Sequence, residues 1–334
     1  MLYYIMRKKM SRLLTTVSTI TFLSTSSVLA DVPKVVTDIA PVHSLVSRVM
    51  DGIGAPDLIV PNEASPHDYR LRPADAEAIE NAKLVFWMGE GLTPWMERAL
   101  TALGNDANVV ELLALNETEA LPFREGALFE AHDHDDHDDH DDHDDDKEHD
   151  DHDDHDDHAG HDHGEFDPHA WLSTKNAKTW LNVIAAKLSS LDPENAGTYF
   201  ANANEARSEI DALDDEVNKM LNPVRSGKFV VFHDAYQYFE AVYDFPASGA
   251  ISLGDASDPS AARIAEIAAR IKNENIKCVL SEPQFNTGLV KTVMGGTDAT
   301  TEVIDPLGFG IEPGSSLYPK LIRAMAQSLV NCLK

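Results

Sequence analysis

The chain has 334 residues, of which 57 are acidic and 27 basic, and its formal net charge at pH 7 is −30. A field this negative repels the phosphates of nucleic acids and attracts cations, so the composition argues against DNA or RNA binding. The length is sufficient for two domains of ordinary size once a signal segment and a low-complexity tract are set aside.

The first thirty residues have the pattern of a secretory signal peptide. A basic segment (residues 7–12) precedes an apolar and hydroxyl-rich stretch (13–23), and Val28-Leu29-Ala30 supplies the cleavage site. A membrane anchor is the alternative, but the apolar stretch is short and interrupted by Thr and Ser. The sequence therefore predicts a cleaved signal peptide over 1–30 and a soluble, periplasmic mature chain that begins at Asp31.

Strand and helix patterns alternate along the mature chain. Buried or alternating apolar runs predict strands at 35–39, 57–61, 84–88, 229–232, 249–253, 278–280 and 301–304. Helical spacing and N-terminal Pro predict helices at 41–49, 73–82, 192–221, 235–242, 258–271, 287–294 and 317–333. This order is typical of an α/β fold with parallel sheets flanked by helices. It predicts an N-terminal lobe over 31–191, one long linking helix over 192–221, and a C-terminal lobe over 222–334.

A tract rich in His and Asp interrupts the N-terminal lobe. Residues 132–163, called the His-Asp tract below, hold eighteen acidic residues and one lysine, and so contribute −17 of the net charge. Imidazole and carboxylate suit zinc and similar divalent metals, whereas the alternative is an acidic spacer in which histidine is incidental. With so few apolar residues the tract is expected to be disordered without metal. We interpret its histidines as auxiliary zinc ligands: His132, His134, His137, His140, His143, His149, His152, His155, His158, His161 and His163.

The chain contains two cysteines, Cys278 and Cys332. In an oxidising compartment they are expected to form a disulfide. The bond would close a loop of about fifty-five residues and contribute roughly 4 kcal/mol in the chain-entropy model. A metal-bound or catalytic thiol is the rival interpretation, although neither cysteine has a CxxC partner.

Four histidines lie outside the tract. His67, His169 and His233 each follow a predicted strand or enter a helix, and each has an aspartate one or two residues away. Asp305 follows the last predicted strand, and ligands of open α/β sheets bind at such strand ends. Three imidazoles and a carboxylate would form a zinc site, with the adjacent aspartates fixing the imidazole tautomers. From spacing alone, any one of the three could equally be a structural histidine, and His43 at a helix start is interpreted as structural.

Five segments resemble signature segments of the ZnuA family, the zinc-binding solute-binding proteins of ABC importers. They are Ser65-Pro66-His67-Asp68-Tyr69, Asp167-Pro168-His169-Ala170-Trp171-Leu172, Phe232-His233-Asp234-Ala235-Tyr236, Ser281-Glu282-Pro283-Gln284-Phe285 and Ile304-Asp305-Pro306-Leu307-Gly308. The resemblance extends over nearly all of the mature chain in the same order, with the His-rich insertion and the cysteine pair.

The resemblance implies two pseudo-symmetric lobes around a rigid helix, with zinc between them. The family's three histidine ligands fall on His67, His169 and His233. Some members have a glutamate ligand directly before the first of these, but here that position is Pro66, which has no donor side chain. The fourth ligand is therefore either Asp305, which related metal-binding proteins use, or water, and Asp305 is favoured.

The function implied is zinc capture in the periplasm and delivery to an inner-membrane ABC permease by a monomeric protein that is not an enzyme. A periplasmic zinc chaperone is a further candidate partner. The alternative is an exported zinc-dependent hydrolase, in which three protein ligands and a water hold a catalytic zinc. Glu282 would be its general base, but the chain has no HExxH or nucleophile-elbow motif.

Overall fold

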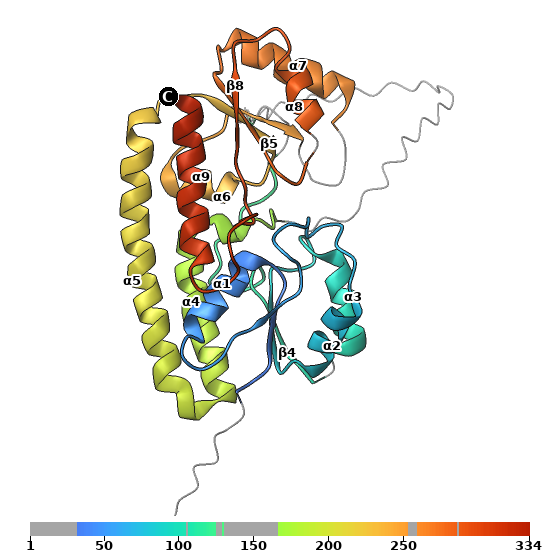
Figure 1. Ribbon diagram of the computed structural model, residues 1–334, viewed down its shortest axis with the longest axis vertical. Helices are drawn as coiled ribbons and strands as arrows, with labels where there is room; N and C mark the ends of the chain where they lie inside the picture. Colours follow the sequence, from blue (N-terminus) through green and yellow to red (C-terminus); the bar gives the residue numbers. More distant parts are fainter. Residues whose placement is uncertain (1–31, 105, 125–128, 130–165, 253–258, 286) are drawn as a thin grey trace, which may run out of the picture. The chain divides into compact units, whose positions relative to one another are not determined.

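The computed structural model describes residues 32–104, 106–124, 129, 166–252, 259–285 and 287–334. Within these ranges the strands form two four-stranded sheets, and every pair of neighbouring strands is parallel (Figure 1). The first sheet has the order β2-β1-β3-β4 and the second has the order β6-β5-β7-β8, so the two lobes repeat one topology. The strands are β1 Val35–Thr37, β2 Asp57–Leu58, β3 Leu84–Trp87, β4 Asn108–Glu111, β5 Phe229–His233, β6 Ala250–Ser252, β7 Cys278–Ser281 and β8 Thr300–Val303.

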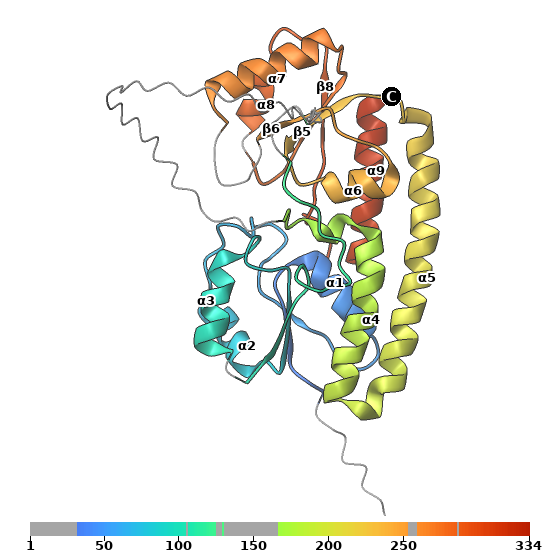
Figure 2. The same ribbon diagram turned by 180° about the vertical axis from the view of Figure 1, so that it is seen from behind.

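Helices cover both faces of each sheet. Helices α2 and α3 lie on one face of the first sheet, and α7 and α8 lie on one face of the second (Figures 1 and 2). Helices α4, α5 and α9 lie side by side on the opposite side of the two sheets. The bounds are α1 Ala40–Val49, α2 Pro73–Asn81, α3 Pro94–Leu103, α4 Thr174–Leu191, α5 Ala196–Leu221, α6 Gln237–Tyr243, α7 Ala261–Asn273, α8 Thr287–Val293 and α9 Leu317–Leu333. The α/β fold with two parallel sheets flanked by helices is confirmed.

One hydrophobic core joins the two lobes. A single cluster of buried residues contains Val35 and Phe86 from the first sheet together with Val231 and Leu280 from the second. The buried stripe of α5, from Tyr199 to Leu221, belongs to the same cluster. Two smaller clusters lie beneath the outer helices, one in each lobe. Because close-packed interiors transmit strain, the shared core fixes the two sheets relative to each other.

The structure differs from the sequence prediction in several elements. Strand β4 and helices α3 and α4 were not among the predicted elements, and the long helix α5 begins at Ala196 instead of residue 192. Asp192, at the predicted start, lies before the helix, and its Oδ2 accepts hydrogen bonds from Asn195 (2.7 Å) and from the Tyr199 hydroxyl (2.9 Å). A short 3-10 turn, Pro193–Asn195, therefore precedes α5.

Cys278 and Cys332 form a disulfide, as predicted, with a Cα–Cα distance of 5.4 Å. The bond joins β7 to the last turn of α9, and both cysteines are buried. The prediction of a signal peptide over 1–30 and of metal binding by the His-Asp tract concerns segments outside the described residues. Among the helices that the structure does describe, none has the length and apolar character needed to cross a bilayer.

Asp38 is a fully buried carboxylate that ties two strands of the first sheet together. The backbone N–H of Ile39 donates to its Oδ1 (2.8 Å), and that of Met88, just after β3, donates to its Oδ2 (2.7 Å). Burial raises the pKa of Asp38 to about 7, against the lowering effect of these two N–H groups. In the unfolded chain an aspartate titrates near 3.9. The folded state therefore binds a proton that the unfolded state releases, and stability falls as the pH rises from about 4 to 7.

We expect this carboxylate to make the metal-free protein less stable at neutral pH than at pH 5. One pKa unit corresponds to about 1.4 kcal/mol, so the free energy of unfolding should fall by roughly 2 kcal/mol between pH 5 and 7 through Asp38 alone. Asp38→Asn should be less stable at pH 5 but lose less stability over this interval. Urea unfolding at several pH values measures the slope, with Asp51→Asn on an exposed turn as the control. Parallel slopes for wild type and Asp38→Asn would contradict the prediction.

Candidate metal site

The carboxyl ends of the strands bring histidines from both lobes to one pocket. His233 is the last residue of β5, His67 lies in the loop between β2 and α2, and His169 precedes the 3-10 turn Ala170–Leu172. Loops at the carboxyl ends of parallel strands meet at one edge, which is where ligands of α/β sheets bind. The pocket is lined by Ser65, Pro66, His67, His169, Trp171, His233, Glu282, Gln284, Phe285, Pro306 and Leu307.

A buried carboxylate sets the orientation of His169. Oδ1 of Asp167 accepts hydrogen bonds from the backbone N–H of His169 (2.9 Å) and from its ring Nδ1 (2.7 Å). A carboxylate only accepts, so Nδ1 carries the proton and the neutral ring has its lone pair at Nε2. Both residues are buried.

Glu282 has the same role for His233 in the other lobe. Its Oε1 accepts a hydrogen bond from Nδ1 of His233 at 2.7 Å, and its side chain is only 1% exposed. Glu282 directly follows β7, the neighbour of β5 in the sheet, so adjacent strand ends hold the imidazole and its partner. The lone pair of neutral His233 is therefore also at Nε2.

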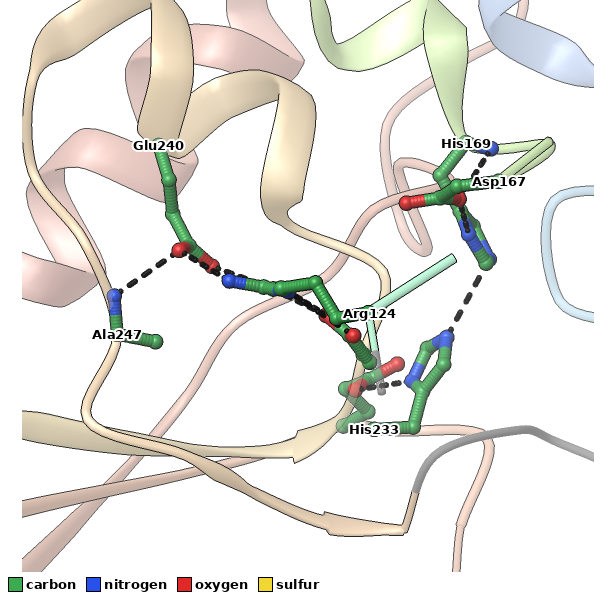
Figure 3. A network of polar contacts seen from close by, with 8 residues as sticks. Arg124, Asp167, His169, His233, Glu240 and Ala247 are labelled. Carbon is green, nitrogen blue, oxygen red and sulfur yellow. Dashed lines mark hydrogen bonds and ion pairs between the residues drawn. The ribbon is translucent and has the colours of Figure 1, made fainter. Parts of the chain in front are cut away.

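The two Nε2 atoms face each other at 3.4 Å (Figure 3). With both protons on Nδ1, neither Nε2 can donate to the other, and the two lone pairs repel unless a cation lies between them. Two nitrogens bound to one tetrahedral zinc at 2.0–2.1 Å are about 3.4 Å apart. The spacing therefore matches that of two nitrogen ligands on one tetrahedral zinc, with Nδ1 of each ring bonded to a carboxylate.

His67 lines the same pocket but lies farther from this pair. Its ring centroid is 6.0 Å from that of His169, whereas the His169 and His233 centroids are 5.3 Å apart. Over the described ranges, no three His, Cys, Asp or Glu side chains are close enough to hold a metal ion as they stand. The His67 loop is held by the Trp95 indole N–H, which donates to the carbonyl of Pro66 at 2.8 Å. His67 would have to move closer to the other two rings for all three to bind one metal ion.

Asp305 is not among the residues that line the pocket, although Pro306 and Leu307 are. Its Oδ1 accepts from the backbone N–H of Leu307 (3.0 Å) and from Nε2 of Gln284 (3.1 Å), and its Oδ2 accepts from the N–H of Phe309. The indole N–H of Trp171 donates to the carbonyl of the next residue, Pro306, at 2.8 Å. The residues beside Asp305 line the pocket, whereas its own carboxylate accepts hydrogen bonds from its loop and from Gln284.

Arg124 forms an ion-pair network beside His233. Its guanidinium pairs with Asp234 and with Glu240, and the backbone N–H of Ala247 donates to Glu240 at 3.0 Å (Figure 3). Burial raises the pKa values of both carboxyl groups, whereas the guanidinium lowers them. The network joins Arg124, which precedes the His-Asp tract in the sequence, to the segment after β5 and to α6.

The hydrogen-bond partners of His169, His233 and His43 agree only in part with the predictions from the sequence. The expectation that an adjacent aspartate fixes the tautomer is correct for Asp167, but wrong for Asp234, which pairs with Arg124 while Glu282 holds His233. The position of Glu282 at the end of a predicted strand was the available signal. His43 is nearly buried, and its Nε2 contacts the carbonyl of Pro56 at 3.2 Å, which agrees with a structural role.

Comparison with known proteins identifies the family. The family described as "Zinc-uptake complex component A periplasmic", ZnuA, matches residues 35–332. The chain belongs to the ZnuA family. It is 49% identical over 313 residues to the high-affinity zinc uptake system protein ZnuA of Brucella abortus, covering 92% of this chain and 94% of that one. Identity to the protein of the same name from Paracoccus denitrificans is 46%, over 91% of this chain and 93% of that one.

Solved structures show the same fold. A crystal structure of ZnuA aligns with a TM-score of 0.70 at 22% identity, covering 91% of this chain and all of the other. A zinc-bound deletion mutant of ZnuA aligns with a TM-score of 0.69 at 22% identity, over 91% of this chain and 99% of the other. The ZnuA resemblance inferred from the five sequence segments is thus confirmed at the level of family and fold.

We expect Glu282→Gln to weaken zinc binding by about 10- to 100-fold, the usual effect of losing a carboxylate that orients a ligand imidazole. The neutral amide is a weaker acceptor for the Nδ1 proton and no longer fixes the His233 tautomer. Competition against a chelator of known affinity measures the change. The control is Glu266→Gln, an exposed glutamate on α7. Unchanged affinity in a folded Glu282→Gln protein would contradict this role for Glu282.

Proposed function

We propose that this protein captures zinc in the periplasm and delivers it to the membrane permease of an ABC importer. The observation that carries the proposal is the pair of facing Nε2 atoms, 3.4 Å apart, at the edge where strand ends of a ZnuA-family chain meet. Relatives at 46–49% identity are named high-affinity zinc uptake system proteins, which supports zinc as the cargo.

We further propose that His67, His169 and His233 are the protein ligands of the tight zinc. The Nε2 atoms of His169 and His233 face each other, each ring has Nδ1 bonded to a carboxylate, and His67 lines the same pocket. The fourth position belongs to Asp305 or to water. Three imidazoles favour zinc over manganese, which prefers more oxygen ligands. The histidines of the His-Asp tract (132–163) are proposed to bind additional zinc more weakly.

Export, processing and partners belong to the same proposal. The signal-peptide pattern supports cleavage after Ala30. The mature chain would consist of two lobes (31–191 and 222–334) joined by a linking segment (192–221) that contains α5. The mature protein would act as a monomer with the inner-membrane permease, and a periplasmic zinc chaperone is a further proposed partner. Membership in a family of solute-binding proteins supports a non-enzymatic role.

The rival function, an exported zinc-dependent hydrolase, lacks support at the site. It needs a general base beside the metal, and Glu282 was the residue considered for it. The Oε1 of this buried carboxylate accepts the Nδ1 proton of His233, which makes Glu282 an orienting group for a ligand. Orientation through Nδ1 is the usual arrangement around metal-binding histidines.

Replacing any one of His67, His169 and His233 by alanine should abolish the tight zinc site or weaken it by at least 100-fold, because each change removes a nitrogen that would bind the metal. Affinity should also fall as the pH is lowered, since a protonated imidazole cannot bind metal. Chelator competition measures both effects, and His43→Ala, outside the pocket, is the matched control. The proposal fails if all three variants keep wild-type affinity.

Deleting residues 132–163 should lower the number of zinc ions bound per chain and leave one tight ion in place. The tract contains few apolar residues, so the thermal unfolding of the metal-free protein should hardly change. Equilibrium dialysis with metal analysis counts the ions, and calorimetry follows unfolding. If the deletion removed the tight ion, tract histidines would have to belong to the primary site.

A further inference from the structure

Gln284 is a polar pocket residue to which neither the sequence motifs nor the proposed ligand set gives a role. It lies in the segment after β7, two residues beyond Glu282, and its side chain lines the pocket with the three histidines. Its amide nitrogen donates to Oδ1 of Asp305 at 3.1 Å. Its amide oxygen is buried and accepts no hydrogen bond from any residue that the structure describes.

The hydrogen bond from Nε2 of Gln284 to Asp305 determines that the amide oxygen, and not the nitrogen, is the end left without a partner. Exchanging the two ends would place the amide oxygen against the carboxylate, and two acceptors cannot share a hydrogen bond. Asp305 itself is held by the N–H groups of Leu307 and Phe309, so its carboxylate is a firmly placed anchor. Gln284 is thus oriented by Asp305 with its oxygen free to accept.

A buried acceptor without a donor is costly, and the two facing histidines, His169 and His233, cannot relieve this cost. Nε2 of His169 and of His233 carry no proton in the tautomers set by Asp167 and Glu282. A water bound to zinc would supply the missing donor, because coordination polarises its O–H bonds.

We propose that the amide oxygen of Gln284 accepts a hydrogen bond from a water at the fourth coordination position, and that Asp305 acts by orienting this amide. The inference rests on the zinc site proposed above and narrows the fourth position to water. Gln284 and Asp305 are positioning residues, and neither touches the metal. The water is the replaceable ligand of the site, whereas the imidazole nitrogens stay in place.

The first test uses variants of the mature full-length chain. Gln284→Met keeps the length of the side chain without its amide and should weaken zinc binding by about tenfold, as expected for the loss of a partner to a bound ligand. Asp305→Ala should weaken binding to a similar extent. The double variant should resemble either single variant, because Asp305 acts through Gln284. The matched control is Gln327→Met, an exposed glutamine on α9 whose amide bonds to Asn331.

The second test uses one equivalent of cobalt and azide as a probe of the fourth position. Azide replaces a bound water and changes the visible absorption of the cobalt. In the wild type, the amide oxygen stabilises water and repels the anion. Azide affinity should therefore rise severalfold in Gln284→Met and in Asp305→Ala, the opposite direction to the change in zinc affinity. General damage to the fold would not produce this reversal.

Several outcomes would overturn the proposal while leaving the three histidine ligands intact. Tighter zinc binding by Gln284→Met would mean that the amide holds back Asp305, which then ligates when released. Additive effects of Gln284→Met and Asp305→Ala, or a cobalt spectrum insensitive to azide, would also reject the water. A zinc-bound crystal structure with the Asp305 carboxylate on the metal would do the same. Retention of tight zinc by His169→Ala, in contrast, would reject the zinc site itself.

Discussion

The site depends on the single hydrophobic core that holds the two sheets together. His169 follows the first sheet in the chain and His233 ends a strand of the second, so no local structure fixes the 3.4 Å between their Nε2 atoms. That distance depends on the core that both sheets share with α4, α5 and α9, in which α5 packs against α4 and α9, and α9 packs on β7 and β8. Removing even one methylene from a close-packed core shifts the residues around it. The buried residues of α5 therefore influence the geometry of the site, although the helix contributes no residue to the pocket.

Buried carboxylates then prepare the pocket for a cation. Asp167 and Glu282 are buried and each accepts a hydrogen bond from an imidazole Nδ1, and Asp234 lies close by with its charge offset by Arg124. Placing carboxylates in a low-dielectric interior is unfavourable unless charge or hydrogen bonds compensate them. A divalent ion between the two Nε2 atoms would compensate Asp167 and Glu282 through the rings that they hold. The same groups that orient the ligands therefore supply part of the attraction for the metal.

Much of this arrangement follows from local sequence patterns. Apolar runs such as Phe229–Phe232 predicted the strands, and histidines placed after strands predicted the edge where they meet. Other features depend on residues distant in sequence. Asp234 was expected to hold its neighbour His233, but the strand order places Glu282 there and Arg124 against Asp234. Helix α4 was missed although Trp180, Leu181, Ile184 and Leu188 have helical spacing. The start of α5 was predicted at residue 192, but a 3-10 turn precedes the helix and Asp192 bonds to Tyr199.

Glu282, which accepts the hydrogen bond from His233, also restricts which type of side chain can occupy position 233. Glu282 is 1% exposed, and its Oε1 requires a proton donor, which Nδ1 of an imidazole supplies. A carboxylate in place of His233 would meet Glu282 as a second buried negative charge at short range, and one of the two would have to be protonated. An imidazole avoids this repulsion and turns its remaining nitrogen to the metal. In the proposed zinc site, Glu282 would therefore favour a nitrogen donor at this position, and with it zinc over manganese, without itself ligating the ion.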